Sequence, residues 1–234
     1  MRRSVLILLL AAAVALGGTG LRAAAHGHHS YIYQNSQWDC VDTDAHGADW
    51  HGRDMRGRRL ENIDLHGANL SGVNLSGATL KCVNFDSADL RNANFAGARL
   101  TGVSFNDAKL NGARFDDSKL TGVDLRGTAL STVADVRPIF TECTGCDVSG
   151  VDLHGRDLSG TKLVGVDFAD TDLRGVNFSN AELTGVDFNG AKVAGANFDD
   201  ARIVGCSLHN VDLRHTNIYS AHLTGIDFRD AQLP

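Results

Sequence analysis

The sequence predicts a solenoid of stacked five-residue repeats, and three observations lead to this fold class. From residue 48 the chain divides into consecutive fives, in which the third residue is Leu or Phe with few exceptions. Phenylalanines recur every ten residues within two separate stretches. The two stretches also match each other at an offset of 103 residues. Internal repetition of this kind is typical of arrays in which each unit contacts only its neighbours.

The five-residue period excludes the simple amphipathic elements. An amphipathic helix repeats every 3.6 residues, and a half-buried strand repeats every two. One pentad cannot bury its single Leu or Phe, whereas stacked coils align these side chains in a continuous ladder. Each burial contributes roughly 1.5–3 kcal/mol of hydrophobic free energy before the entropy of ordering is subtracted. Glycine in the fifth position, as in Leu-His-Gly at 65–67, suits a turn at the end of each pentad.

Pentads such as ANLSG (68–72), ADLRN (88–92) and VDFAD (166–170) resemble the A(D/N)LXX pattern of the pentapeptide-repeat family. The resemblance extends over residues 43–132 and 141–234. It implies an all-β fold, a right-handed quadrilateral β-helix with four pentads in each coil. It also implies that the large third residue and the small first residue of each pentad point inward, while the other three positions face solvent.

The spacing of the phenylalanines adds a second prediction. Phe85, Phe95, Phe105 and Phe115 are ten residues apart, and the same spacing recurs from Phe168 to Phe198. With four pentads in a coil, ten residues are half a coil, so the phenylalanines should occupy two opposite faces. Phe85 should then stack on Phe105, and Phe95 on Phe115, at an interstrand spacing of about 4.8 Å.

The internal duplication predicts how the two arrays are joined. The offset of 103 residues equals whole coils plus three residues, and the interruption at 133–140 (VADVRPIF) is one pentad plus three. We therefore expect one continuous solenoid of about nine coils with one bulged loop. The predicted organisation is a signal peptide at 1–25, an N-terminal cap at 26–42, a first array at 43–132, the loop at 133–140 and a second array at 141–234.

The N-terminus has the pattern of an export signal. Arg2 and Arg3 precede an apolar run from Val5 to Leu16, and small residues follow at Ala23–Ala25. The run is too short for a comfortable membrane span, so a cleaved signal peptide and a periplasmic or secreted protein are predicted. Cleavage also removes Arg22, and the net charge of −6 becomes −9. An acidic protein is a poor candidate for direct nucleic-acid binding.

Cleavage after Ala25 would expose a candidate metal site at His26, His28 and His29. An α-amine, two backbone amides and the imidazole at the third residue form a square-planar ligand set that suits Cu(II) or Ni(II). No other cofactor is expected. His46 and His66 occupy the same outward position one coil apart, and we interpret them as solvated surface residues.

By spacing, one pair of the five cysteines is near enough to form a disulfide, and Cys40 lies too far from Cys143. Cys143 and Cys146 are the candidate pair, because Cys146 and Cys206 would lie three coils apart, too far to bridge. Both candidates occupy inward positions, which favours a structural disulfide over a redox-active one. Cys82 takes an outward fifth position and is expected to be a free thiol.

Carboxylates are frequent at the second position of the pentads. They could form acidic ladders that attract cations or basic partners. The alternative is that these short side chains hydrogen-bond the turns in which they lie. The residues concerned are Asp44, Asp49, Asp54, Asp64, Asp152, Asp157, Asp167, Asp172, Asp187 and Asp212.

No set of nucleophile, base and orienting residue stands out, so no catalytic residue is predicted. We expect an exported, non-enzymatic protein whose surface binds or scaffolds an unknown protein or envelope component, with no membrane span after signal cleavage. The resemblance implies two further points: family members often dimerise through the C-terminal coil, and some mimic DNA and protect gyrase from quinolones. A DNA mimic and a Cu or Ni binder at His26–His29 are therefore the alternative functions.

Overall fold

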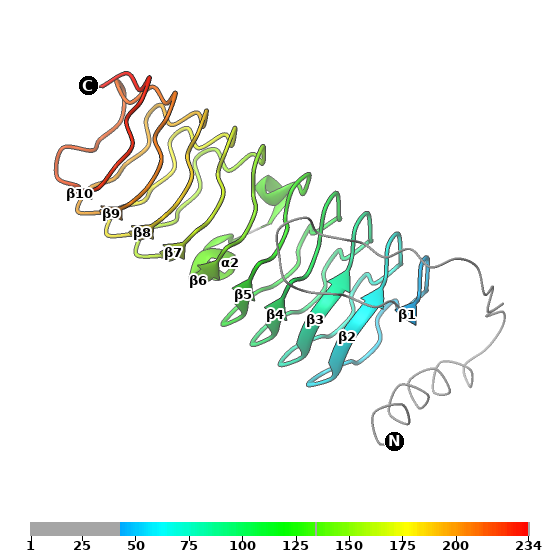
Figure 1. Cartoon of the computed structure of the whole chain (residues 1–234). Helices are drawn as coiled ribbons and strands as arrows, with labels where there is room; N and C mark the ends of the chain where they lie inside the picture. The colour runs from blue at the N-terminus through cyan, green and yellow to red at the C-terminus, as the bar shows by residue number, and fades with distance from the viewer. Residues whose placement is uncertain (1–42, 134, 234) are drawn as a thin grey trace. The chain divides into compact units, whose positions relative to one another are not determined.

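The computed structural model describes residues 43–133 and 135–233, which form a parallel β-solenoid (Figure 1). Ten strands make one sheet in the order β1 to β10, so each strand neighbours the one before and after it in the chain. The predicted signal peptide, the cap segment and His26, His28 and His29 lie outside the described residues. The predicted all-β fold of about nine coils is confirmed.

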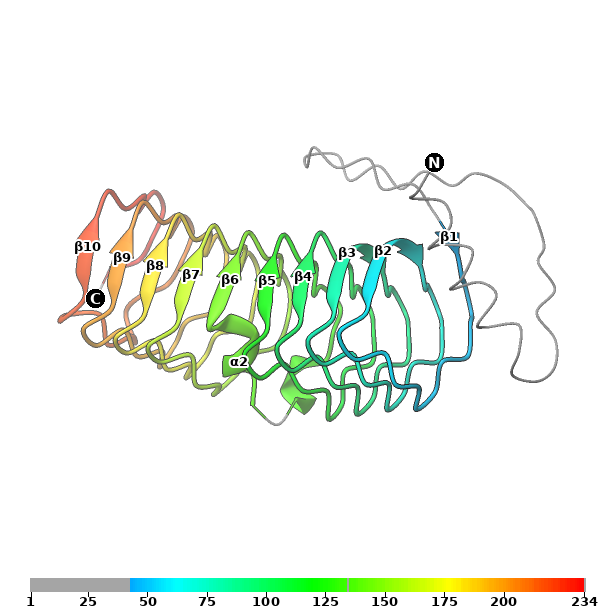
Figure 2. The same ribbon diagram turned by 90° about the horizontal axis from the view of Figure 1, so that it is seen from below.

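The strands are short, and all pair in parallel with the next coil (Figure 2). They are β1 (Thr43–Asp44), β2 (Arg59–Asp64), β3 (Thr79–Asn84), β4 (Arg99–Thr101), β5 (Lys119–Thr121), β6 (Glu142–Thr144), β7 (Lys162–Val164), β8 (Glu182–Thr184), β9 (Arg202–Val204) and β10 (His222–Thr224). Two single helical turns, η1 (Leu130–Thr132) and α2 (Arg137–Phe140), interrupt the series. No helix within the described residues has the length and apolarity needed to cross a membrane.

The core contains a pair of aromatic ladders beside its buried leucines. The rings of Phe85 and Phe105 stack at 5.3 Å, and those of Phe95 and Phe115 stack at 4.9 Å, as predicted. Phe85 and Phe95 meet edge to face at 6.2 Å, so the two ladders touch across the interior of the coil. All of these rings are at most 2% exposed. Stacked and edge-to-face pairs are the preferred aromatic geometries, and they hold successive coils in register.

The fifth residue of the pentad has a left-handed backbone. Gly67 has a φ of 62° and Asn92 a φ of 58°. This conformation strains most side chains but suits Gly, Asn and Asp, which explains why these residues dominate the position. The turns at the corners are therefore encoded locally, one pentad at a time.

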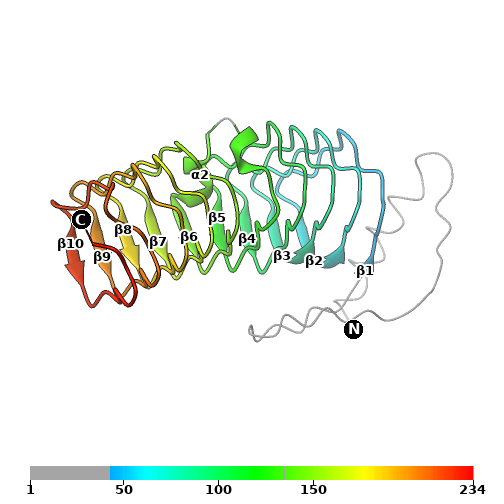
Figure 3. The ribbon, with the colours of Figure 1, turned by 90° about the horizontal axis from the view of Figure 1, so that it is seen from above.

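The insertion at 133–140 does not break the solenoid. Strand β5 pairs with β6 through Leu120 and Cys143, and Asp124 bridges Asp147, so the register shifts from the usual 20 residues to 23. These three extra residues were predicted from the duplication. On the other two faces the bridges end at Lys109 and Arg114 and resume in the second array, since η1 and α2 bulge out of the coil there (Figure 3).

Removal of one ring from the ladder should destabilise the fold. Phe105→Ala leaves a cavity between the stacked neighbours and is expected to lower the free energy of unfolding by about 3–5 kcal/mol. Phe228→Ala, on the same face but only half-buried in the last coil, should cost clearly less. Chemical denaturation of both variants checks this, and equal losses would contradict the ladder as the main source of stability.

Candidate binding surfaces

One face of the solenoid presents a column of second-position residues, most of which are aspartates. Its members are linked coil to coil by parallel bridges, and the column passes the insertion without a break. The acidic column consists of Asp44, Asp64, Asn84, Ser104, Asp124, Asp147, Asp167, Asp187, Ser207 and Asp227. The face that bears it is called the acidic face. Its outward cations among the described residues are Arg126 and Arg229, so its charge is strongly negative.

The carboxylates of the column also hydrogen-bond their own turns. The backbone N–H of Ala169 donates to Asp167 at 2.8 Å, and that of Asn189 donates to Asp187 at 2.9 Å. The same bond recurs at Asp44, Asp64, Asp124, Asp147 and Asp227. The aspartates of the column therefore stabilise their own turns, which is the alternative that the sequence offered for them. At Asp124 and Asp227 the second carboxylate oxygen pairs with Arg126 and Arg229, each at 2.6 Å.

Crowding perturbs the middle of the column. Burial raises the pKa of Asp167, and the carboxylates of Asp147 and Asp187 raise it further. Asp86, on the same face, has its pKa raised mainly by burial, while a hydrogen bond from Ser104 opposes the shift. Like charges stacked one coil apart repel each other. A cationic partner on this face would relieve that repulsion.

A different face neutralises its carboxylates internally. Arg91 pairs with Asp89 at 2.5 Å, Arg174 with Asp172 at 2.5 Å and Arg214 with Asp212 at 2.7 Å. The guanidinium of Arg214 lowers the pKa of Asp212 to about 2. Each pair lies within one pentad, so these charges cancel locally. The faces of the solenoid therefore differ in charge, although every pentad follows the same pattern.

Two histidines of the first coils stack on each other. The rings of His46 and His66 are 5.1 Å apart and nearly parallel, on the acidic face. Within the described residues no group of three or more His, Cys, Asp or Glu side chains is placed to hold a metal ion. The predicted copper or nickel site at His26, His28 and His29 lies outside that part of the chain and stays a prediction.

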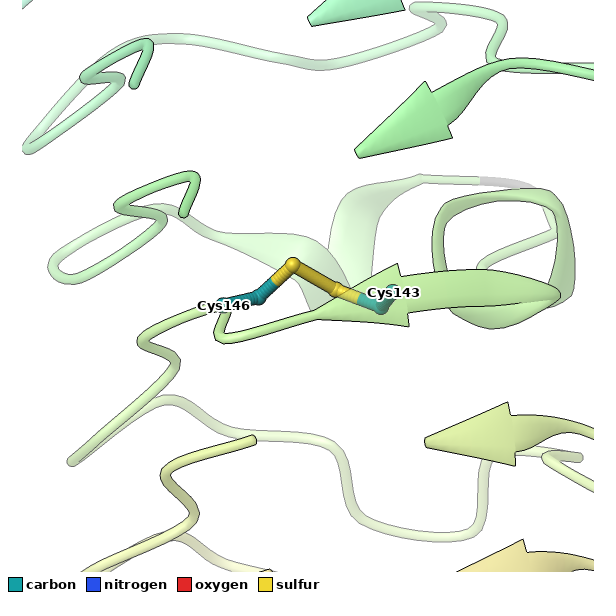
Figure 4. Close-up of a disulfide and its surroundings, with 2 residues drawn as sticks. All are labelled: Cys143 and Cys146. Carbon is teal, nitrogen blue, oxygen red and sulfur yellow. A yellow bond between two sulfur atoms is a disulfide. The ribbon is translucent and has the colours of Figure 1, made fainter. Parts of the chain in front are cut away.

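The structure brings Cys143 and Cys146 together in a disulfide (Figure 4). Their Cα atoms are 6.1 Å apart, and both side chains are buried directly after the insertion. Cys143 takes the place that Leu120 and Leu163 hold in the neighbouring coils. The bond therefore links two neighbouring pentads at the point where the repeat resumes. Cys206 is a buried free thiol.

The expectation for Cys82 was wrong. Cys82 is disulfide-bonded, and its side chain is only 8% exposed. The prediction took the outward fifth position of Cys82 as the sign of a free thiol. The five-residue period gives the position of a side chain in its pentad but does not report whether that side chain is bonded.

The insertion produces the main irregularity of the described surface. Ile139 and Phe140 of α2 are fully buried and anchor the turn, and the ring of Phe140 lies 6.0 Å from that of Phe168. Pro138 stands between two shallow grooves. One groove, of about 390 Å³, is lined by Asp116, Asp117, Ser118, Lys119, Pro138 and Thr141. The other, of about 300 Å³, is lined by Asp135, Arg137, Pro138, Thr141, Ser159, Gly160 and Thr161.

Sequence reasoning overlooked Arg156 at the insertion. Arg156 occupies a first position, where small inward residues are the rule, and it is half-buried. Its guanidinium donates to the carbonyl of Val133 at 3.3 Å, while Arg137 lies 3.5 Å from Asp157. These contacts fix the insertion to the following coil. The sequence did contain a signal for this contact, namely an arginine at a position that usually has a small inward residue.

Comparison with known proteins places this repeat in a family. A family model described as "Pentapeptide repeat region" matches residues 48–115. A second, "Pentapeptide repeats (8 copies)", matches residues 98–133, 157–190 and 194–230. No curated protein sequence matches the chain.

Solved structures with similar coils include three relatives. HetL, a protein involved in heterocyst differentiation regulation from the cyanobacterium Nostoc, is 27% identical over 82% of this chain and 85% of its own, with a TM-score of 0.31. A trypsin-treated form of QnrB1, a plasmid-mediated fluoroquinolone resistance protein, is 21% identical over 80% and 89%, with a TM-score of 0.41. A protein from the Arabidopsis thaliana thylakoid lumen is 27% identical over 58% and 68%, with a TM-score of 0.27.

The two kinds of aspartate should respond to substitution with opposite signs. Because the folded-state pKa of Asp167 is raised, its ionised form costs stability at neutral pH, and that stability returns as the pH falls through the raised pKa. Asp167→Asn, which keeps the oxygen that accepts from Ala169, should raise the melting temperature at pH 7. The gain should shrink as the pH falls through the raised pKa and be absent below pH 3.8, the ordinary pKa of the group.

Asp212→Asn is the matched control. Its lowered pKa contributes stability above pH 3.8 that is lost as the pH falls toward about 2. The substitution should therefore lower the melting temperature at pH 7, by an amount that disappears in acid. Thermal unfolding of both variants between pH 2 and 7 checks the signs, and a shift in the same direction for both would refute the assignment.

Proposed function

The chain belongs to the pentapeptide-repeat family, and from that premise we propose that it is an exported, non-catalytic binding protein whose acidic face contacts a basic protein partner in the bacterial envelope. The acidic column is the observation that supports this proposal most directly. Seven of its ten members are aspartates, its bridges pass the insertion unbroken, and burial together with the carboxylates of Asp147 and Asp187 raises the pKa of Asp167. Complementary charge on a partner speeds association and selects among partners.

Scaffolding suits this architecture better than catalysis does. Stacked coils offer an extended surface whose charged groups repeat at the interstrand spacing of about 4.8 Å. The two described grooves are shallow and open, unlike the enclosed and largely apolar clefts in which small-molecule chemistry usually takes place. The export signal predicted at residues 1–25 supports an envelope location.

Cross-linking from one coil in living cells tests the proposal. A photoreactive residue is introduced singly at Ser149, His154, Ser159 or Val164, which follow one another around the four faces. We expect a cross-linked protein only from Ser149 on the acidic face, recovered from the periplasmic fraction with a mature chain that begins at His26. The intact mass of that chain also reports whether Cys143 and Cys146 are oxidised.

Other outcomes of the same experiment contradict the proposal. Equal cross-linking from all four positions would mean that the acidic face is not selective. An uncleaved cytoplasmic chain cross-linked to gyrase would favour the alternative of DNA mimicry, which the acidic column also suits. Export would argue against that alternative because gyrase is cytoplasmic.

We also propose that a second copy covers the C-terminal coil. Strand β10 is exposed along its length, and Leu223 and Leu233 are 40% and 58% exposed, whereas the matching Leu183 and Leu213 are fully buried. An open coil end presents both apolar side chains and an unpaired strand edge. A second copy would bury both.

Sedimentation at micromolar concentration measures this association. The wild type should be a dimer, and Leu223→Glu should be monomeric because a charge would be buried at the contact. Thr224→Glu, on the outer side of the same strand, should remain a dimer. A monomeric wild type would contradict the proposed contact.

A further inference from the structure

The strand face of the solenoid, which is the face built by β2 to β10, changes charge along its length. In the first array its second-position column is in register from β2 to β5 and consists of Arg59, Thr79, Arg99 and Lys119. We call these four residues the basic segment. The three cations are exposed, and the segment contains no carboxylate.

The same column is balanced in the second array. Lys162 and Glu182 are partners in register, with Lys162 Nζ 3.7 Å from Glu182 Oε2, and Arg202 follows Glu182 in the next coil. Opposite charges that are neighbours across strands stabilise each other and largely cancel. The surplus positive charge of the strand face therefore lies in the first array.

Neighbouring side chains leave this positive charge in excess. Arg59 pairs with Glu61 of its own strand at 2.6 Å, whereas Arg99 forms no ion pair within the described part of the chain. The fourth-position column beside the segment continues from Glu61 to Lys81 and then to two threonines. Together the two columns contain four cations and one carboxylate.

The strand face is flat between these side chains. Leu100 and Leu120 point inward and are each 1% exposed. The fifth positions that follow are Gly102 and Gly122, which have a left-handed φ of 59° and 58° and no side chain. The corner between the strand face and the acidic face is therefore bare beside β4 and β5. A flat surface with regularly spaced cations suits a second regular surface better than a small ligand, which needs a cleft.

The acidic column of the same protein has the matching geometry. Its residues repeat once per coil at about 4.8 Å, as do those of the basic segment, because one solenoid generates both. Asp167 and Asp187 have Ala169 and Asn189 at the fourth position of their pentads, and neither aspartate forms an ion pair among the described residues. Burial and like charge raise the pKa of Asp167, so a cation that approaches it would stabilise its ionised form.

An antiparallel arrangement of two copies matches the two columns residue by residue. With the first coil of one copy beside the last coil of the other, every cation of the basic segment faces a carboxylate and its threonine faces a serine. The facing pairs are Arg59 and Asp227, Thr79 and Ser207, Arg99 and Asp187, and Lys119 and Asp167. In the next two coils Glu142 faces Asp147, a like-charged pair, and Lys162 faces Asp124. This register superposes the full length of the two solenoids.

We propose that the basic segment binds the acidic column of a second copy, side by side and antiparallel. Asp227 already pairs with Arg229 at 2.6 Å, so the contacts of Arg99 and Lys119 contribute most. Exposed ion pairs are individually weak, so this association is weaker than the C-terminal contact and is sensitive to salt. The two surfaces differ, so each copy keeps one of them unused and association continues beyond the dimer.

The acidic column that the proposed function assigns to a basic envelope partner is the same surface that a second copy would cover. The side-by-side contact therefore rests on that proposal, and the two occupants compete for the column. The basic segment is a different surface and stays accessible when a partner occupies the acidic column. Purified protein contains no envelope partner, so self-association can be measured separately.

Sedimentation equilibrium of the mature chain with Leu223→Glu isolates the side-by-side contact, because this substitution removes the C-terminal contact. At low salt the average mass should rise above that of the monomer between micromolar and submillimolar concentration. At about 1 M salt, where the Debye length is about 3 Å, the mass should return to that of the monomer. In this background Arg99→Glu should weaken association about tenfold, and Asp187→Arg should do the same, because each replaces an attraction by a repulsion.

Charge exchange identifies the partner surface. Arg99→Glu combined with Asp187→Arg restores opposite charges at the contact between copies, so the double variant should regain association. Arg202→Glu is the matched control, because Arg202 lies on the same strand face and faces the uncharged Asn84 in this register. It should associate like its parent. Equal losses in Arg202→Glu and Arg99→Glu, or a double variant no better than the single ones, would overturn the proposal.

Other outcomes assign the surfaces differently. A monomer at every concentration in low salt would exclude the contact. If the protein instead sedimented with phosphatidylglycerol vesicles, and Arg99→Glu abolished that binding, the occupant of the basic segment would be a lipid surface and not a second copy. Cross-links from Ser149 to another protein, without self-association of the purified chain, would support the proposed function and refute this contact. Cross-links only between copies, with self-association, would do the reverse.

Discussion

Coil-to-coil stacking of the third residue is the interaction on which the rest of the structure depends. The rings of Phe178 and Phe198 stack at 5.1 Å, and Leu163 pairs in register with Leu183. Because each pentad offers one large side chain, no coil is stable by itself, and burial is achieved only between coils. The strands, the turns and the outward columns all take their spacing from this stack.

The insertion shows how far that stacking tolerates irregularity. The strand face and the acidic face remain paired across it through Leu120–Cys143 and Asp124–Asp147. On the other two faces the helical turns η1 and α2 interrupt the bridges between coils. Phe140 of α2 contributes a buried ring to the core there. A disulfide directly after the insertion and an arginine that binds its backbone keep the departure local.

The surface chemistry follows from the same geometry. Side chains that are 20 residues apart become neighbours, so one substitution per coil creates a column with a charge of its own. In the acidic column two of the aspartates pair with an arginine of their own pentad, whereas the column that contains Asp172 and Arg174 is more fully paired, so one pentad pattern yields faces of different charge. Specificity in such a fold lies in the choice of outward residues.

The sequence by itself determined the fold, the coil register and the three extra residues at 133–140, because the five-residue period records which side chains point inward. It also identified the Cys143–Cys146 pair. Only the tertiary structure decided that Cys82 is bonded, that Arg156 secures the insertion, and that the ion pairs differ from one face to another. A periodic signal reports which side chains point inward, but it contains no information about which outward side chains meet or about the places where the period fails.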